Sequence, residues 1–264
     1  MIDLGLSGRR ALVTGAGVGI GRATACALAA AGCDVALVDR DGDALADAVA
    51  ETRTAGGQAV ALEADLRVDG AALDAVDRTV AALGGLDVAV NNVGSLAGLV
   101  PAPFVDQDDG YVHEVVAQNL LVTAACARAE ARTMVDAGHG GVILNVSSGE
   151  STRPALRLAV YGAAKAAINH LTQTLAVELG PAGVRVNAVA PGTTLTPTVR
   201  AALSDEYVAA LVDSIPLRRM NEPDDLARLV VALASDLGRG VTGQLVLADN
   251  GAHLARNRPV LDAG

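Results

Sequence analysis

Short apolar runs alternate with longer stretches of helical pattern along this chain, and this alternation limits what the chain can fold into. Seven runs are predicted to be strands: Arg10–Thr14, Asp34–Val38, Gln58–Leu62, Leu86–Val90, Gly141–Val146, Val184–Val189 and Gln244–Leu247. Continuous apolar character is typical of parallel strands that helices cover on both faces. Helices are expected to end at Ala31 and Ala55 and then to span Val68–Leu83, Asp106–Ala137 and Tyr161–Leu179. No linker or charge block divides the 264 residues, so the sequence predicts a single α/β domain, 1–264, with a doubly wound parallel sheet.

Composition excludes several classes of function. Aromatic residues are only 2% of a chain that is 51% hydrophobic, so stacking platforms for single-stranded nucleic acid are excluded. The formal net charge of −10 repels phosphate backbones, and we expect no nucleic-acid partner. No apolar run reaches the roughly 18 residues of a membrane span, and no signal peptide is evident, so no membrane association is expected. Cys26, Cys33 and Cys126 form no metal-ligand spacing, which predicts no metal site and a reducing, cytoplasmic location.

A glycine-rich string follows the first predicted strand and opens a helix. In Thr14–Gly21 the glycines let backbone N–H groups approach a pyrophosphate, and the helix N-terminus adds partial positive charge. Asp39 ends the next strand about 20 residues on, where a carboxylate accepts the ribose hydroxyls of NAD(H) and repels the 2′-phosphate of NADP(H). Arg40 offers a partner for that phosphate, so NADP(H) is the less favoured cofactor. The alternatives are an ordinary turn for the glycines and a helix cap near Asp41 for Asp39. With this loop the predicted sheet is Rossmann-like, with about seven strands and helices on both faces.

Tyr161 and Lys165 are four residues apart at the start of a predicted helix and therefore share one face. A phenol with an ordinary pKa of about 10 is a poor base at neutral pH. A neighbouring ammonium and a nicotinamide cation would both lower that pKa, so Tyr161 could take a proton from an alcohol and return it to a ketone. The alternative is an ordinary solvated helix face.

Over residues 7–251 the chain resembles the short-chain dehydrogenase/reductase family in its common form. The resemblance rests on seven motifs in order: Thr14–Gly21, Asp65-Leu66, Asn91–Gly94, Asn119, Ser147-Ser148, Tyr161 with Lys165, and Pro191-Gly192. It implies that Tyr161 is the acid/base, that Lys165 lowers its pKa and binds the nicotinamide ribose, and that Ser148 hydrogen-bonds the substrate oxygen. Asn119 would hold a water that links Lys165 to solvent. The alternative for Asn119 is a backbone bond in a kinked helix, and Ser147 is expected to be a structural neighbour.

The resemblance also implies how NAD(H) is held. Asp65 would meet the adenine edge, Asn92 would support the central strands, Val189 and Thr193 would lie near the nicotinamide, and Thr196 would lie near the phosphates. The expected cofactor-binding residues are Gly15, Gly17, Val18, Gly19, Ile20, Gly21, Asp39, Arg40, Asp65, Leu66, Asn92, Val93, Gly94, Tyr161, Lys165, Pro191, Gly192, Thr193, Thr194 and Thr196.

Two loop-like segments, Gly94–Pro103 and 191–216, are expected to form the rim and lid of a substrate pocket. The pocket is predicted to include Ser95, Leu96, Ser148, Glu150, Leu156, Leu158, Thr194, Leu195 and Val199, and Arg153 is a further candidate. Most are small or aliphatic, which favours a compact hydrophobic or alicyclic substrate. Glu150 either bonds a second hydroxyl or faces water. The C-terminal segment contains Asp249-Asn250-Gly251 where two glycines are usual in the family, and this difference is expected to change a subunit contact or the pocket floor.

These observations predict an NAD(H)-dependent enzyme that interconverts a secondary alcohol and a ketone. The alternatives within the family are a cis-dihydrodiol dehydrogenase that forms a catechol and a 3-oxoacyl-thioester reductase. The non-enzymatic alternative is a cofactor-sensing regulatory protein. Because the family commonly forms tetramers, a homotetramer is expected, with the tail His253–Gly264 packed against its own or a neighbouring subunit.

Overall fold

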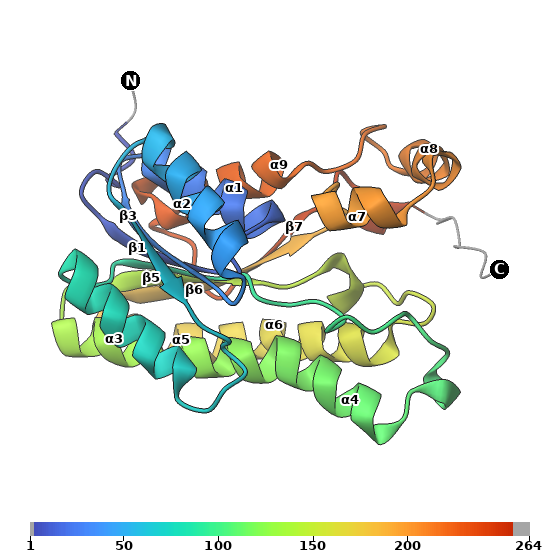
Figure 1. Cartoon of the computed structure of the whole chain (residues 1–264), viewed down its shortest axis with the longest axis horizontal. Helices are drawn as coiled ribbons and strands as arrows, with labels where there is room; N and C mark the ends of the chain where they lie inside the picture. Colours follow the sequence, from blue (N-terminus) through green and yellow to red (C-terminus); the bar gives the residue numbers. More distant parts are fainter. Residues whose placement is uncertain (1–2, 256–264) are drawn as a thin grey trace.

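The computed structural model describes residues 3–255 and contains one seven-stranded parallel sheet (Figure 1). The strand order is β3-β2-β1-β4-β5-β6-β7. The strands are β1 (Arg10–Thr14), β2 (Asp34–Asp39), β3 (Ala59–Glu63), β4 (Val88–Asn91), β5 (Gly141–Val146), β6 (Val184–Pro191) and β7 (Leu245–Ala248). The order reverses between β1 and β4, so the predicted doubly wound, Rossmann-like sheet is confirmed. The tail from residue 256 onward lies outside the described residues.

Helices cover both faces of the sheet (Figure 1). One face carries α1 (Gly19–Ala30), α2 (Gly42–Ala55) and α9 (Pro223–Ala234), and the other carries α3 (Ala71–Leu83), α4 (Asp109–Val116), α5 (Val122–Ala137) and α6 (Ala159–Leu179). Two short helices, α7 (Pro197–Ala202) and α8 (Asp205–Ser214), follow β6 and lie beyond the carboxyl end of the sheet. Within the described residues no helix combines the length and the apolar character needed to cross a bilayer.

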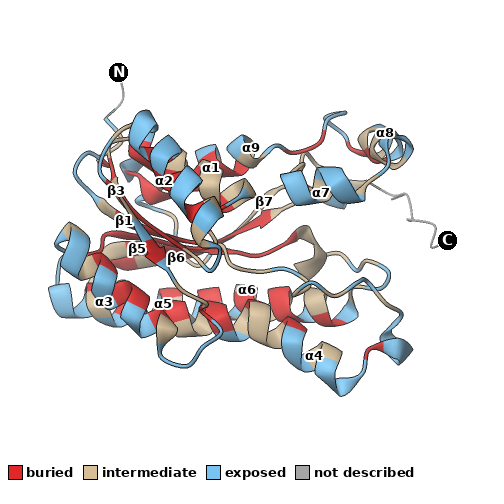
Figure 2. Cartoon of the chain, in the orientation of Figure 1, coloured by how far each residue is buried: buried red, intermediate tan, exposed pale blue. Residues whose placement is uncertain are grey.

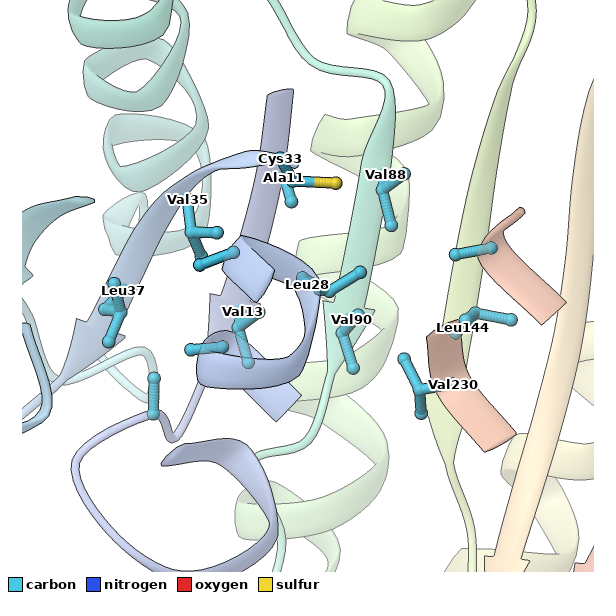
Figure 3. Packing of buried hydrophobic residues seen from close by; sticks show 14 of the residues in the cluster. Ala11, Val13, Leu28, Cys33, Val35, Leu37, Val88, Val90, Leu144 and Val230 are labelled. Carbon is cyan, nitrogen blue, oxygen red and sulfur yellow. The ribbon is translucent and has the colours of Figure 1, made fainter. Parts of the chain in front are cut away.

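The core forms two layers because side chains alternate across each strand. Ala11 and Val13 of β1 pack with Leu28 of α1 on one face, as Figure 3 shows, while Leu12 packs with the helices on the other face. The five central strands are buried along nearly their whole length, whereas the edge strands β3 and β7 are partly exposed (Figure 2). Double-sided coverage therefore explains why their sequences are apolar without a period of two.

Two predicted segments differ from the observed elements. The helix expected over Asp106–Ala137 begins later, at Asp109, because Asp108 caps α4 by accepting from the N–H of Tyr111 at 2.8 Å. A π-helical turn at Ala117–Leu121 then separates α4 from α5. The third helix begins at Ala71 rather than Val68, because Gly70 before it adopts a positive φ of 83°. The segment expected to be a lid contains two capped helices, α7 and α8, rather than a simple loop.

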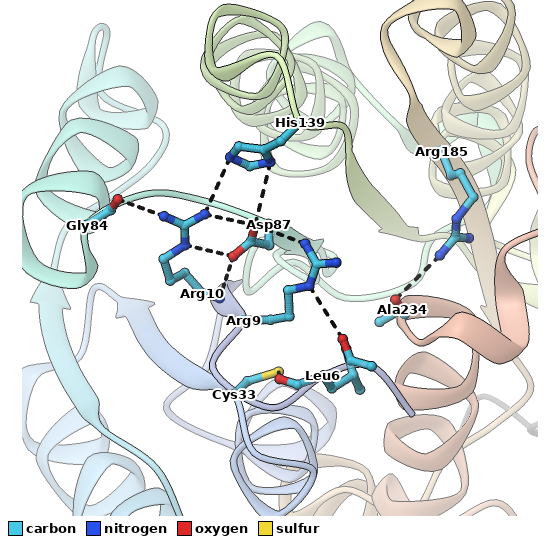
Figure 4. A network of polar contacts seen from close by, with 10 residues as sticks. Leu6, Arg9, Arg10, Cys33, Gly84, Asp87, His139, Arg185 and Ala234 are labelled. Carbon is cyan, nitrogen blue, oxygen red and sulfur yellow. Dashed lines mark hydrogen bonds and ion pairs between the residues drawn. The ribbon is translucent and has the colours of Figure 1, made fainter. Parts of the chain in front are cut away.

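A polar cluster closes the amino-terminal edge of the sheet, opposite the loops described below (Figure 4). The Asp87 carboxylate is 4% exposed and accepts from the backbone N–H of Arg10 at 2.8 Å and from its Nε at 2.7 Å. Arg9 and His139 lie 3.3 and 3.8 Å from the same carboxylate. Burial acts to raise the pKa of Asp87, but the Arg10 hydrogen bonds outweigh burial and hold the pKa below its ordinary value. This edge is therefore satisfied internally.

Candidate active site

The glycine-rich loop connects the carboxyl end of β1 to the first turn of α1. Gly15 and Gly19 have φ values of 62° and 57°, in the region that favours glycine. Val18 occupies the N-cap position of α1 and makes no side-chain cap, and the first turn contains no acidic residue. The N–H groups at this helix end are therefore not capped by the chain's own side chains and can donate to an anion.

The loop is held in shape by Asn92 and Thr14. The Asn92 Nδ2 donates to the carbonyl oxygens of Thr14 and Gly15 at 3.1 and 3.0 Å. The Thr14 hydroxyl in turn accepts from the backbone N–H of Asn92 at 3.0 Å. A Cβ on Gly21 would overlap both the Gly15 carbonyl and the Asn92 amide, so close packing requires glycine at that position. The sequence analysis does not predict this positioning role of Thr14. A polar residue at the end of a buried strand could have indicated it.

A cavity of about 390 Å³ opens beside this loop. Many of the expected cofactor-binding residues line it: Gly15, Val18, Gly19, Ile20, Asp39, Arg40, Asp65, Leu66, Asn92, Val93, Gly94 and Thr196. Gly17 and Gly21 lie behind the lining and shape the loop, whereas Gln118, Thr198 and Arg67 line the cavity without having been predicted. The cavity extends from the end of β2 to the end of β4, across the point where strand order reverses.

Asp39 lies at the end of β2 and faces this cavity. Its carboxylate accepts from the N–H of Gly17 at 2.9 Å and from the N–H of Asp41 at 3.2 Å. The cap of α2 is Asp41, which accepts from the N–H of Ala44 at 3.1 Å. Asp41, and not Asp39, is therefore the residue that caps α2.

Asp65 and Arg67 form an ion pair at the far end of the cavity. The Arg67 Nη2 lies 2.6 Å from the Asp65 carboxylate, and this hydrogen-bonded arginine is the main reason that the pKa of Asp65 falls to about 2. The backbone N–H of Arg67 also bonds the carboxylate, at 3.0 Å. The ion pair fixes the loop that follows β3. The sequence of this loop gives no signal from which the pairing of Arg67 with Asp65 could be predicted.

Tyr161 and Lys165 occupy one face of α6, as their spacing predicts. The Lys165 Nζ lies 5.8 Å from the centroid of the Tyr161 ring and donates to the carbonyl oxygen of Val146 at 2.9 Å. Burial lowers the pKa of Lys165 to about 8. A Cβ on Gly94 would overlap Nζ, so glycine there leaves room for the ammonium.

Ser148 lies at the end of β5, beside Tyr161. Its hydroxyl accepts from the N–H of Glu150 at 3.2 Å and is hydrogen-bonded to the Tyr161 side chain. Burial raises the pKa of Tyr161, the bond to Ser148 acts in the opposite direction, and the charge of Glu150 raises it further. The lowered pKa expected from the sequence is therefore not seen in the chain alone. Desolvation of the buried phenol, which the spacing of Tyr161 and Lys165 does not reveal, is the main cause of the raised pKa. Ser147 has a structural role, because its hydroxyl donates to the Lys165 carbonyl at 3.2 Å.

Asn119 lies in the π-helical turn between α4 and α5 and is fully buried. Its Nδ2 donates to the carbonyl oxygens of Ser95 and Val115 at 2.7 and 2.8 Å, so the backbone bond considered from the sequence is present. Its Oδ1 accepts no hydrogen bond from the described residues. Both this oxygen and the Lys165 Nζ border the position that a Cβ on Gly94 would fill. One side chain thus bonds the backbone and presents a buried acceptor toward the lysine.

The segment after β6 packs against the glycine-rich loop and also lines a second cavity. Pro191 ends β6, Gly192 packs against Asp249, and Thr196 caps α7 by accepting from Val199 N–H at 3.2 Å. Thr194 is buried and pairs with Asn221.

The predicted substrate-pocket residues are divided between different places. Ser95 and Val199 line the large cavity, while Glu150 lines a smaller one of about 40 Å³ together with Gly192 and Thr193. Leu195 packs instead into a cluster around Leu211, Ile215 and Met220. Leu156 is 72% exposed, and neither cavity is lined by Leu96, Leu156 or Leu158.

The smaller cavity is lined by both polar and apolar residues. Its lining comprises Gly149, Glu150, Arg153, Gly192, Thr193, Leu211, Ser214, Ile215, Asn221, Asp249, Ala252 and His253. Asp249 forms part of the wall of this cavity. Charged and polar side chains thus line this cavity together with the apolar Leu211, Ile215 and Ala252, while the predicted Leu96, Leu156 and Leu158 lie elsewhere.

The residues present fit a dinucleotide. The glycine loop supplies N–H donors for a pyrophosphate, Asp39 supplies a ribose acceptor, and Lys165 with the Asn119 Oδ1 forms a buried polar pair at the opposite end. Residues 3–255 contain no group of three or more His, Cys, Asp or Glu side chains arranged for a metal ion.

Comparisons with known proteins agree with this geometry. A family model described as "Enoyl-(Acyl carrier protein) reductase" matches residues 15–253. The chain is 38% identical to a cyclohexanol dehydrogenase from Rhodococcus sp. over 94% of this chain and 97% of that protein. It is 39% identical to the L-xylulose reductase of Bos taurus over 95% and 98% of the two chains. A solved structure of a 7 alpha-hydroxysteroid dehydrogenase with NADH and 7-oxo glycochenodeoxycholic acid superimposes with a TM-score of 0.89, at 32% identity, over 94% of this chain and 96% of that one.

Proposed function

The chain belongs to the short-chain dehydrogenase/reductase family of oxidoreductases, and from that premise we propose that it interconverts a secondary alcohol and a ketone with NAD(H). The proposed substrate is small, free in solution, and largely alicyclic or aliphatic. The observation that carries the proposal is the convergence of Ser148, Tyr161 and Lys165, with the Lys165 Nζ next to Gly94, which lines the cavity beside the glycine loop.

Ser148 and Tyr161 perform the proton chemistry in this proposal. Their hydrogen-bonded hydroxyl groups form a pair that can hold one substrate oxygen between them. In reduction the Tyr161 hydroxyl donates its proton to the carbonyl oxygen, and in oxidation the phenolate takes the proton back. Ser148 stabilises the negative charge that develops on that oxygen. Bound NAD(H) supplies the hydride donor or acceptor that the side chains lack.

Lys165 and Asn119 supply charge and a route for the proton. With a pKa of about 8, Lys165 remains mostly protonated at neutral pH, and its ammonium favours the Tyr161 phenolate. The same ammonium is placed to bond the nicotinamide ribose. The buried Oδ1 of Asn119 offers an acceptor for a water that passes protons to Lys165.

Asp39 supports the preference for NAD(H). Its carboxylate borders the cavity at the position where the adenosine ribose is expected, and a 2′-phosphate there would meet a like charge. Arg40 lines the same cavity and is the group that would favour NADP(H).

We further propose a homotetramer in the cytoplasm. Leu121 beside α5 and Val177 on α6 are 57% and 78% exposed, which favours their burial between subunits. The three cysteines are free thiols, as in a reducing compartment.

The proposal is tested with a panel of alcohols and ketones and with both cofactors. The absorbance of the reduced nicotinamide monitors each reaction. We expect turnover of cyclic secondary alcohols with NAD and faster reaction than with a carrier-linked 3-oxoacyl substrate, since a net charge of −10 repels an acidic carrier. An aromatic product would identify the dihydrodiol alternative. Tight cofactor binding without turnover of any substrate would favour the regulatory alternative and refute the proposal.

A further inference from the structure

A short turn after β5 determines the direction of the Ser148 hydroxyl. This 3₁₀ turn, Gly149–Ser151, begins directly after Ser148. The Ser148 hydroxyl caps the turn by accepting from the N–H of Glu150 at 3.2 Å. The position of the turn therefore decides where the hydroxyl lies relative to the neighbouring helix α6.

Ser151 closes the turn and also connects it to α6. Its backbone N–H and its hydroxyl both donate to the carbonyl oxygen of Ser148, at 3.0 and 2.6 Å. The same hydroxyl accepts from the Nδ2 of Asn169 at 2.8 Å. Asn169 lies on α6, about one helical turn after Lys165. A relay of two hydrogen bonds thus runs from α6 through the Ser151 hydroxyl to the backbone of Ser148.

The turn and the end of β5 also pack closely against α6. A Cβ on Gly162, the residue after Tyr161, would lie 3.0 Å from the carbonyl oxygen of Glu150. Glycine at this position therefore lets the turn approach the helix. The end of the strand is held to the same helix, because the Ser147 hydroxyl donates to the carbonyl oxygen of Lys165 at 3.2 Å.

The proposed reaction needs the hydroxyl groups of Ser148 and Tyr161 on one substrate oxygen, yet the two groups come from different elements. A displacement of about 1 Å can slow such a reaction by about 100-fold. We propose that Ser151 and Asn169 are positioning residues, whose relay fixes the turn after Ser148 relative to the helix that carries the tyrosine. Both residues act through Ser148 and need no contact with the substrate. This inference rests on the proposed oxidoreductase function and adds two residues to its site.

The test removes each half of the relay. Ser151→Ala removes the hydroxyl, and Asn169→Leu keeps the approximate shape of the side chain but removes its donor. Thr152→Val is the control, because the exposed Thr152 hydroxyl donates to the Gly149 carbonyl at 3.1 Å, a bond that stays within the turn. The kcat and KM are measured with NADH and the ketone of the panel that reacts fastest. NADH binding is measured separately by fluorescence titration.

Ser151→Ala and Asn169→Leu should each lower kcat by about 10-fold or more, because Ser148 then loses its fixed position. The dissociation constant and the stoichiometry of NADH should not change. The double variant should lose no more than Ser151→Ala, since the two side chains act as one relay. Ser151→Thr retains the hydroxyl and should restore most of the rate, and Thr152→Val should behave as the native enzyme.

A merely structural role would lower the fraction of folded enzyme, so that kcat falls in proportion to the stoichiometry of NADH. That outcome refutes the inference, as does near-native kcat in both single variants. Additive losses in the double variant, a rate for Ser151→Thr as low as that of Ser151→Ala, or an equal loss in Thr152→Val also contradict it. Absence of turnover by the native enzyme with every substrate and both cofactors would instead refute the proposed function.

Discussion

Replacing Glu130 by glutamine is expected to stabilise the protein at neutral and alkaline pH. Glu130 lies on α5 and is fully buried, with Oε2 accepting from the Nδ2 of Asn91 at 2.9 Å. That amide also donates to the Oδ1 of Asn145 at 3.0 Å. The Glu130 Oε1 and the Asn91 Oδ1 are buried acceptors to which none of the described residues donates. A glutamine can accept from Asn91 through its oxygen and supply N–H groups to this acceptor-rich site.

The magnitude follows from the pKa of the carboxyl group. Burial raises the pKa of Glu130 from 4.5 to about 7, while the Asn91 hydrogen bond acts in the opposite direction. Between these two values the unfolded chain has released the proton and the folded chain still holds it. The free energy of unfolding therefore falls as the pH rises through this window, by about 3 kcal/mol in total, since one pKa unit corresponds to about 1.4 kcal/mol. Below the unfolded value the contribution is fully present, and above about pH 7 it has been lost.

The assay is urea unfolding of the native protein and of Glu130→Gln at about pH 5 and about pH 8, at equal protein concentration. The two proteins should differ little at the lower pH, and the variant should be more stable at the higher pH by up to about 3 kcal/mol, or roughly 6–12 °C in Tm. Glu178→Gln is the control, since it makes the same chemical change at an exposed position of α6. The reasoning is refuted if Glu130→Gln changes stability by the same amount at both pH values, or lowers it at the higher pH.

Three other substitutions test the site. Tyr161→Phe should lower kcat by about 100-fold or more with little change in cofactor affinity, the scale of losing a positioned acid/base, and near-normal turnover would contradict the mechanism. Asp39→Ala should narrow the preference for NAD over NADP in steady-state kinetics, and a native preference for NADP would contradict the role given to this carboxylate. Gly21→Ala should weaken NADH binding by about 10-fold or more in fluorescence titration, because a methyl group would overlap the Gly15 carbonyl and displace the helix end that donates to the phosphates. Gly180→Ala is its control, since this glycine has a φ of −52° and no neighbour near a Cβ, and an equal loss of binding in the two variants would refute the argument.

The elements that could be predicted from the sequence are those whose signals are local. Continuous apolar runs identify strands that are covered on both faces, and the sheet confirms them with shifts of a few residues at their ends. The glycine loop was predictable for a similar reason, because the positive φ values at positions 15 and 19 favour glycine, and glycines are visible in the sequence. The spacing of Tyr161 and Lys165 also needs nothing beyond the periodicity of a helix.

The parts that escaped prediction depend on contacts between distant segments. The π-helical turn at Asn119 is associated with bonds to Val115 and to Ser95, the latter 24 residues away, and helical periodicity carries no trace of the second bond. The raised pKa of Tyr161 arises from burial, which a sequence reports poorly for a half-polar side chain. Leu156 and Leu158 follow Ser148 in the chain, which suggests a place in the pocket, but the direction of their side chains depends on how the loop after β5 packs.

The contrast between the two edges of the sheet explains why function is confined to one of them. At the amino-terminal edge, the charged groups of Asp87 and Arg10 are paired with each other, and Arg10 also bonds the carbonyl of Gly84 (Figure 4). At the carboxyl edge, the first turn of α1 has no side-chain cap, and none of residues 3–255 donates to the Asn119 Oδ1. A buried polar group without a partner costs free energy, and a ligand that supplies the missing hydrogen bond removes that cost. Strand order reverses between β1 and β4 at this edge, which opens space for that ligand. Binding of the cofactor should therefore stabilise the folded chain as well as supply the hydride, with the gain set by the ratio of its concentration to its dissociation constant.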